Sequence, residues 1–512
     1  MNAELCAIIE IGSTGVRLNV AEVYTGPEGG WKVLDRAARP VSLGRDVFTS
    51  GVLSRESILE CLTVLHNYRE LLSGWGIADK NIHVIATSAL RAARNRDVFI
   101  DRVKQETGFK LSIVEGIEEN RLMYLAVRFA LKQDLPLFWR SNSMIVEIGG
   151  GSTEIMLLRR GQMVAAHSLK MGTIIIDQRS RHGFSHGVIF ERYLNENIKT
   201  TLGMLNMEMD LTHVRTVVAA GADARLAADE AGSELNENCR IIEREDFYKF
   251  VEKLKNLSIQ DCIQKFGISY ADADGLFLGL LVLKLFLDRT GTAKIAVPQV
   301  SIRDGYLIDL ASGVDASLQN EFFSQIVASA VNLGRKFHFD EAHGKHVASH
   351  CMVIFDALTK EHGMNLRHRI MLETAAILHD VGTYIKASGH QKHGQYIVAN
   401  SEIFGLHQDE LGLIANVINC HRGDPPGQSD IDFMSLQRED RVLVLKMASI
   451  LRIADCLDRG HSQQIKKITV ERRSETIVLH VERAYDLSME LMGLEEKGGM
   501  FQDVFGYKVV LS

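Results

Sequence analysis

The stretch IIEIGSTG at residues 8–15 decides the fold, because it returns as IVEIGGGST at residues 145–153. Each copy is a short apolar run that ends in Glu-Ile-Gly and enters a turn of glycine, serine and threonine. Further apolar runs follow the turns, at residues 16–23 and 154–158, so each copy predicts a strand, a tight turn and a returning strand. The repeat, 137 residues apart, indicates two related halves that face each other.

Outward from the repeat, strand and helix patterns alternate to about residue 310, which predicts an α/β architecture. The expected helices are 55–74, 96–107, 118–132, 245–265 and 273–287, and the expected further strands are 82–86, 215–221 and 293–298. From 318 to about 460 long helical stretches dominate. A hairpin at 468–481 and a last strand at 507–511 then predict a small α+β cap at the C-terminus.

The composition is that of a soluble globular protein, with 46% apolar and 24% charged residues in 512, enough for three or four domains. A net charge of -7 argues against binding to nucleic acid through a general basic surface. Seven widely spaced cysteines without a Cys-x-x-Cys pair predict buried thiols rather than a disulfide framework. Without a signal-peptide pattern or an 18-residue apolar stretch, we expect a cytoplasmic protein and no membrane span.

The glycine turns have the chemistry of a phosphate site. Glycine lets the backbone N–H groups approach phosphate oxygens, and serine and threonine hydroxyls add donors. A carboxylate at the strand end, Glu10 or Glu147, could hold Mg²⁺ directly or through water. One such turn by itself would more often simply connect two strands, but the duplication favours a pair that grips a phosphate chain from both sides. No Walker loop occurs, so a P-loop NTPase is disfavoured.

Two further polar clusters follow predicted strands. Arg91, in the segment 86–95, offers a bidentate fork for phosphate oxygens where a strand ends. The segment 115–121 starts a helix with several carboxylates, one of which could orient an attacking water as a general base. The alternative is that acidic residues favour helix N-termini without any catalytic role.

Five segments in this order resemble the Ppx/GppA family of exopolyphosphatases and guanosine pentaphosphate phosphohydrolases. They are Ile8–Val20, Ala86–Asn95, Val114–Arg121, Val146–Glu154 and Arg303–Gly305. The resemblance implies two actin-like (RNase H-like) domains with the active cleft between them. It also implies a role for each matching residue: Glu119 activates water, Arg91 contacts substrate phosphate, and Glu147 serves catalysis and holds Mg²⁺ together with Glu10. The implied phosphate-binding residues are Gly12, Ser13, Thr14, Arg17, Gly149, Gly150, Gly151 and Ser152.

The chain departs from the family pattern at Glu10 and Glu147, where the family usually has aspartate. The extra methylene moves each carboxylate by about one C–C bond, and misplacement of that order is costly in a catalytic site.

The histidines are concentrated in one region, since eleven of the 19 lie between His338 and His421. Histidine and aspartate together suit a divalent transition metal. The ordered set His346, His379-Asp380 and Asp455 resembles the HD metal-dependent phosphohydrolase domain, and His393 and His421 could complete a second metal position. We expect six other histidines of the region to be surface or core residues: His338, His343, His350, His362, His368 and His407.

These patterns predict four domains: actin-like domains at 1–135 and 136–312, an all-α HD-type domain at 313–464 and the cap at 465–512. The leading hypothesis is a phosphoric anhydride hydrolase that removes terminal phosphate from polyphosphate, with guanosine pentaphosphate as a second candidate substrate. Its expected cofactors are Mg²⁺ in the cleft and a second divalent transition metal in the HD domain, and its expected form is a homodimer. One alternative places the chemistry in the HD domain, on a nucleotide or phosphoester. Another is a regulatory protein that binds polyphosphate or an alarmone without turnover.

Overall fold

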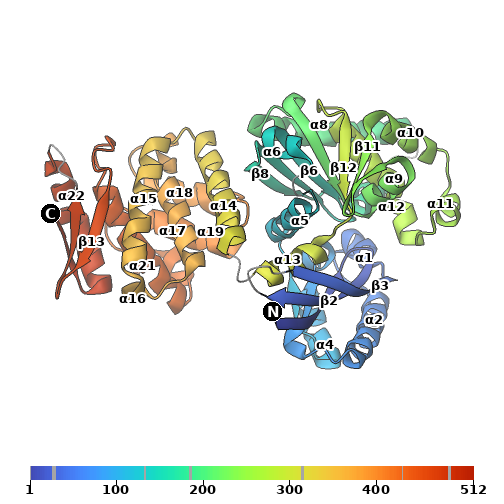
Figure 1. Ribbon diagram of the computed structural model, residues 1–512, viewed down its shortest axis with the longest axis horizontal. Helices are drawn as coiled ribbons and strands as arrows, with labels where there is room; N and C mark the ends of the chain where they lie inside the picture. Colours follow the sequence, from blue (N-terminus) through green and yellow to red (C-terminus); the bar gives the residue numbers. More distant parts are fainter. Residues whose placement is uncertain are drawn as a thin grey trace. The chain divides into compact units, whose positions relative to one another are not determined.

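The computed structural model describes residues 2–25, 30–131, 134–183, 187–312, 316–428, 430–481 and 486–512. The chain forms two compact units, Met1–Glu321 and Phe322–Ser512 (Figure 1). The predicted boundary after residue 312 falls at residues 313–315, which lie outside the described ranges. Among the described helices, none combines the length and apolar content that crossing a bilayer requires.

The first sheet of unit Met1–Glu321 has the strand order β3-β2-β1-β4-β5. Its strands are β1 (Asn2–Ile11), β2 (Gly15–Thr25), β3 (Gly30–Pro40), β4 (Ile82–Ala86) and β5 (Leu111–Ile113). Strand β1 pairs antiparallel with β2 and parallel with β4. Ile9, Ile11 and Leu18 bury one face of this sheet against the covering helices. Those helices are α1 (Leu43–Ser50), α2 (Arg55–Gly74), α3 (Ser88–Ala92) and α4 (Arg96–Thr107).

The second sheet repeats the first, which confirms the duplication predicted from the sequence. Its strand order is β10-β11-β12-β9-β6-β7-β8. The part β8-β7-β6-β9-β12 matches β3-β2-β1-β4-β5 with the same parallel and antiparallel partners. The strands are β6 (Asn142–Ile148), β7 (Thr153–Arg159), β8 (Gln162–Leu169), β9 (Val214–Ala220), β10 (Ser233–Asn236), β11 (Cys239–Glu243) and β12 (Lys294–Pro298).

Helices of the second half pack on this sheet around one apolar core. They include α7 (Thr173–Gly183), α8 (Gly187–Glu208), α9 (Ala222–Ala231), α10 (Arg244–Leu254), α11 (Ile259–Phe266) and α12 (Tyr270–Leu287). The single helix predicted at 245–265 is wrong, because α10 and α11 are separate. Ser258 begins α11 with a capping box, in which its Oγ accepts from the Asp261 N–H over 3.1 Å and Asp261 Oδ2 accepts from the Ser258 N–H over 2.9 Å.

The last helix of this unit returns to the first sheet. Between the halves lie α5 (Gly116–Leu131) and α6 (Pro136–Arg140), and the unit ends with α13 (Ile302–Ser312). Ile302 and Leu307 of α13 share an apolar cluster with Ile8, Val23 and Ile85 of the first sheet. Figure 1 shows α13 beside β2. The predicted second domain, 136–312, therefore differs from the structure at α13, because the apolar back of the first sheet needs a cover that the first 135 residues do not supply.

The unit Phe322–Ser512 is mainly helical, and α14 (Ala316–Lys336) leads into it. Its further helices are α15 (Glu341–Ala357), α16 (Thr359–His362), α17 (Leu366–Leu378), α18 (His390–Ala399), α19 (Gln408–Cys420), α20 (Ile431–Ser435), α21 (Arg438–Cys456) and α22 (Ser488–Phe505). The predicted hairpin is present as β13 (Ile468–Arg472) and β14 (Thr476–Val481), and β15 (Lys508–Leu511) pairs parallel with β14. All seven cysteines are buried thiols, as predicted.

Candidate active site

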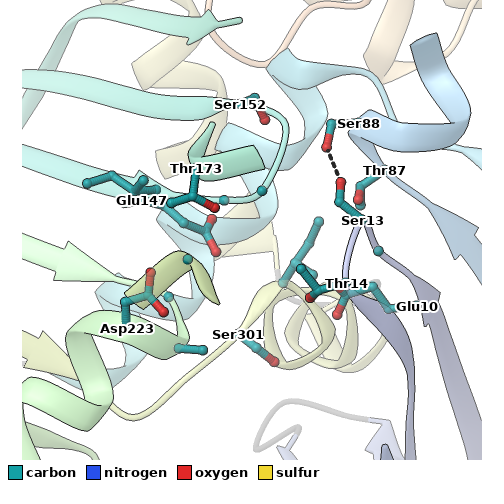
Figure 2. A pocket seen from close by; sticks show the side chains of 18 of the residues that line it. Glu10, Ser13, Thr14, Thr87, Ser88, Glu147, Ser152, Thr173, Asp223 and Ser301 are labelled. Atoms are coloured by element: carbon teal, nitrogen blue, oxygen red, sulfur yellow. Dashed lines mark hydrogen bonds between the residues drawn. The ribbon is translucent and has the colours of Figure 1, made fainter. Parts of the chain in front are cut away.

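The two predicted phosphate turns have the same closure and line one pocket (Figure 2). In the first, the Gly12 N–H donates to the Gly15 carbonyl over 2.9 Å, and in the second the Gly149 N–H donates to the Ser152 carbonyl over 2.9 Å. The turns correspond because the sheets are duplicated: one joins β1 to its antiparallel neighbour β2, and the other joins β6 to its antiparallel neighbour β7. The two halves therefore present equivalent turns to the same pocket.

Close packing explains why the second turn is built of glycine. A Cβ on Gly151 would lie 2.2 Å from Phe48 Cζ, and a Cβ on Gly150 would lie 2.9 Å from Ile174 Cδ1. Carbon atoms at those distances overlap, so any side chain would push the turn away from α1 and α7. The missing side chains allow the backbone of the turn to reach the pocket.

The pocket has a volume of about 160 Å³, and polar side chains dominate its lining. Ten of the residues predicted for the cleft line it: Glu10, Gly12, Ser13, Thr14, Arg17, Glu119, Glu147, Gly149, Gly150 and Ser152. Two do not. Arg91 lies behind Glu119, and Gly151 packs against Phe48.

Sequence reasoning missed several polar residues of the lining, among them Glu154, Thr173, Asp223, Arg225, Asp272 and Arg303. Asp223 and Arg225 follow Gly221, where β9 ends beside β6. The pattern at residues 215–225, a strand followed by glycine and polar residues, was therefore the sequence signal that could have identified Asp223 and Arg225. Asp272 lies on α12 and gives no comparable signal, because the apolar content of that helix masks it.

Glu119 lies in the first turn of α5 and forms a buried pair with Arg91. Arg91 Nη1 donates to Glu119 Oε2 over 2.7 Å and to the Val114 carbonyl over 2.6 Å. Burial raises the pKa of Glu119 to about 7, although the Arg91 guanidinium lowers it and the charge of Glu10 raises it further. A carboxyl group with a pKa near neutrality suits a general base. The Arg91 guanidinium, predicted to contact substrate phosphate, is directed at Glu119.

Glu154 is a second buried carboxyl group near Glu119. It stands opposite Glu147 in the β6–β7 pair, so both side chains leave the same face of the sheet. Ser168 Oγ donates to Glu154 Oε1 over 2.8 Å, and Asn120 Nδ2 donates to Oε2 over 3.3 Å. Burial raises the pKa of Glu154 well above its usual value, and the charge of Glu119 adds to the rise.

Models of known protein families match most of this chain. A model of the Ppx/GppA phosphatase family matches residues 22–313, and a model of Ppx/GppA phosphatase domain III matches residues 327–497. This chain belongs to the Ppx/GppA phosphatase family. It is accordingly an enzyme that hydrolyses phosphoric anhydrides.

Relatives within the Ppx/GppA family extend over most of the chain. A guanosine-5'-triphosphate,3'-diphosphate pyrophosphatase of Pseudoalteromonas translucida is 23% identical over 527 residues, covering 99% of this chain and 98% of the relative. The protein of the same name from Pseudoalteromonas atlantica is 24% identical over 464 residues, covering 88% and 86%. The crystal structure of an exopolyphosphatase from Cytophaga hutchinsonii has a TM-score of 0.54 and 18% identity, covering 61% of this chain and 99% of that one. The last match shows the fold alone.

Ppx/GppA enzymes depend on a divalent metal, and two carboxylates of this pocket fit one. Within the described residues, Glu147 has no hydrogen-bond or ion-pair partner, and its side chain points into the pocket (Figure 2). Burial raises its pKa to about 7, and Glu119 raises it further. Burial also raises the pKa of Asp223 to about 7, with Asp272 adding to the rise. Oxygen ligands suit Mg²⁺, and a bound cation would offset the cost of burying these charges.

Glu10, predicted to help hold Mg²⁺, forms an ion pair with an arginine. Arg303 Nη1 forms an ion pair with Glu10 Oε2, and Arg303 Nε donates to Asn19 Oδ1 over 3.2 Å. The guanidinium already compensates the Glu10 carboxylate, because α13 brings Arg303 back to the end of β1. Glu147 and Asp223, like Glu154, have no such cationic partner within the described residues.

A second cluster of predicted ligands lies in unit Phe322–Ser512. The structure brings His379, Asp380, Asp455 and His421 together, and two unpredicted histidines join them, His343 and His390. His343, at the start of α15, and His390, at the start of α18, are both buried. His343, which we expected to be a surface or core residue, is buried next to these predicted ligands.

His346 and His393 lie outside this cluster, which corrects their prediction as ligands. Each lies three residues after the histidine that takes its place, and three residues turn a side chain about 60° away from its original direction. The buried stripe of α15 contains His343 and Val347, whereas His346 is half-buried and its Nε2 lies 3.1 Å from His350 Nε2. On α18 the buried stripe likewise begins at His390 and omits His393.

Proposed function

We propose that this protein removes the terminal phosphate from inorganic polyphosphate or from guanosine pentaphosphate. Both molecules end in a phosphoric anhydride flanked by negative charge. The names of similar proteins suggest both substrates, since two relatives are named guanosine-5'-triphosphate,3'-diphosphate pyrophosphatase and one protein of similar fold is named an exopolyphosphatase. The pocket lined by both glycine turns would hold the terminal phosphate group that the two substrates share.

The observation that carries the proposal is the position of Glu119. Its carboxylate lines the same pocket as both glycine turns, and Arg91 holds it from behind. A phosphate held by the backbone of the two turns would face this carboxylate, with Arg17 and Arg225 also in the lining. Glu119 is thus placed to act on a water next to the terminal phosphorus.

The reaction needs one proton transfer to the protein. Glu119 takes a proton from water as the water oxygen bonds to phosphorus, and the anhydride P–O bond breaks toward the leaving phosphate oxygen. Arg17, Arg225 and the backbone of the turns stabilise charge on the phosphoryl oxygens. Mg²⁺ held by Glu147 and Asp223 would supply further compensation of that charge.

Glu119→Gln tests the proposal, because the amide keeps the size of the side chain and removes the base. We expect release of phosphate from polyphosphate and from guanosine pentaphosphate to fall by about 10²–10⁴-fold, with unfolding temperature retained. Glu115→Gln is the matched control, since Glu115 is an exposed glutamate one turn earlier and should keep near-normal rates. Near-normal rates in Glu119→Gln would contradict the proposal. The ratio of the two wild-type rates identifies the preferred substrate.

A further inference from the structure

Arg121, on the same helix as Glu119, binds two carboxylates at once. Its Nε and Nη2 donate to the two oxygens of Glu118 over 2.7 and 2.6 Å. Its Nη1 and Nη2 donate to the two oxygens of Asp309 over 2.7 and 3.0 Å. The side chain is 14% exposed and lies outside the described lining of the pocket. All three of its nitrogens are engaged with protein groups, so Arg121 acts on the protein rather than on the substrate.

The two carboxylates differ in which elements they connect. Glu118 belongs to α5 itself, three residues before Arg121, so this ion pair stays within one helix. Asp309 lies on α13, so the second ion pair crosses from α5 to another helix. Only the pair with Asp309 can therefore fix α5 relative to α13.

The contact between α5 and α13 is close but otherwise apolar. A Cβ on Gly305 would lie 2.0 Å from the Leu122 carbonyl oxygen, so the two backbones are adjacent. Apolar side chains of both helices share two clusters. Apolar contacts have no preferred direction, whereas a two-pronged bond between guanidinium and carboxylate has a defined geometry. The apolar clusters thus hold the helices together, and the pair of Arg121 and Asp309 fixes the position of α13 along α5.

Each of these helices supports a different part of the active site. Glu119 lies in the first turn of α5. At the start of α13, Arg303 forms the ion pair with Glu10, at the end of the strand that enters the first glycine turn. Directly before α13, the Val300 carbonyl accepts from Arg225 Nη1 over 2.8 Å. The base therefore depends on α5, while the groups that face the phosphate depend on α13.

Stability alone is a weak reason for a charged group at this contact. Replacing a buried ion pair by apolar residues of similar volume is often neutral or stabilising. We propose that Arg121 is a positioning residue for hydrolysis: its pair with Asp309 fixes α13 along α5 and so aligns Glu119 with the bound phosphate. This inference rests on the role of Glu119 proposed above. A displacement of about 1 Å in such an alignment lowers a rate by about 10²-fold.

Two alanine variants of the full-length protein test the proposal, because each removes one carboxylate and leaves Arg121 paired with the other. We expect Asp309→Ala to lower kcat for phosphate release by about 10–10²-fold with KM within about twofold of wild type. Glu118→Ala is the matched control and should keep kcat within about twofold. Asp309→Glu restores a carboxylate and should recover most of the rate. Equal losses of kcat in the two alanine variants, or a change of KM alone in Asp309→Ala, would overturn the proposal.

Urea unfolding midpoints of the same variants separate positioning from folding. Asp309→Ala should keep the midpoint of Glu118→Ala, because both retain one ion pair of Arg121 and the apolar clusters. If Asp309→Ala unfolds more easily, Asp309→Asn, which keeps the shape of the side chain, takes its place in the kinetic comparison. A loss of kcat that follows the loss of stability across these variants would overturn the positioning role.

A double variant shows whether Asp309 acts through Glu119. In Glu119→Gln no base remains to be aligned, so adding Asp309→Ala should lower the residual rate by less than about threefold. A loss as large as the one in the wild-type background would show that Asp309 acts independently and would overturn the proposal. The two proposals fail in different ways. Near-normal rates in Glu119→Gln contradict the general base, whereas near-normal rates in Asp309→Ala contradict only the positioning role.

Discussion

Removing Arg91 should shift the pH dependence of hydrolysis. Its guanidinium is bonded to Glu119 at 2.7 Å, and their side chains are only 19% and 11% exposed. A hydrogen bond between charged groups contributes about 1.5–3 kcal/mol, and 1.4 kcal/mol corresponds to one pKa unit. Without the guanidinium, the pKa of Glu119 should rise further above its value of about 7. Because Glu119 must be ionised to take a proton, the acid limb of activity should move up by about 1–2 pH units in Arg91→Ala.

The assay is kcat/KM for phosphate release, measured for wild type and Arg91→Ala across the range in which Glu119 titrates. Above the shifted limb the variant should recover much of its activity, because the base is again ionised. Arg94→Ala is the control, since Arg94 bonds to the exposed Ser50 carbonyl and not to Glu119. An acid limb that stays in place while the rate falls uniformly would refute this reasoning and show that Arg91 contacts substrate instead.

Two other predictions concern stability. The pKa of Glu147 is raised to about 7 in the folded protein. Wild type therefore loses stability as the pH rises from the ordinary pKa of a glutamate toward 7, because the folded protein then gives up a proton less readily than the unfolded chain. In the presence of chelator, the unfolding free energy of Glu147→Gln relative to wild type should therefore increase by about 2 kcal/mol between about pH 5 and about pH 8. Urea titrations at the two pH values measure this difference, and a difference that stays constant would contradict the burial argument. Gly151→Ala should lower the unfolding free energy by about 1–3 kcal/mol because its Cβ overlaps Phe48, whereas Gly74→Ala meets nothing within 4 Å and should not. Equal urea midpoints for the two would contradict the packing.

Local sequence patterns correctly predicted several helices and strands of the first half. Helices α2 and α4 and strand β4 have the predicted bounds, because each ends at a clear stop, such as Gly108 after α4. Strand β3 was not predicted. It is a charged edge strand whose residues alternate between half-buried and exposed, so it lacks the apolar signal of the central strands.

The candidate sites show where local patterns stop being informative. The turn residues were predictable, because each motif is contiguous and repeated. The roles of Arg91 and Arg303 were not, since they depend on which carboxylate lies within reach after folding. The choice between His343 and His346 could not be made from the sequence either. The two histidines lie three residues apart, and only the packing of α15 decides which one faces the core.

The return of α13 to the first sheet has a consequence for synthesis on the ribosome. The cluster of Ile8, Val23 and Ile85 is closed by Ile302 and Leu307, which emerge only after the entire second half has been made. The second half contains all strands of its own sheet and can complete its core first. The N-terminal half, although translated first, is thus expected to complete its folding after the second half. Nascent chains that stall before α13 should expose an apolar sheet face and attract chaperones.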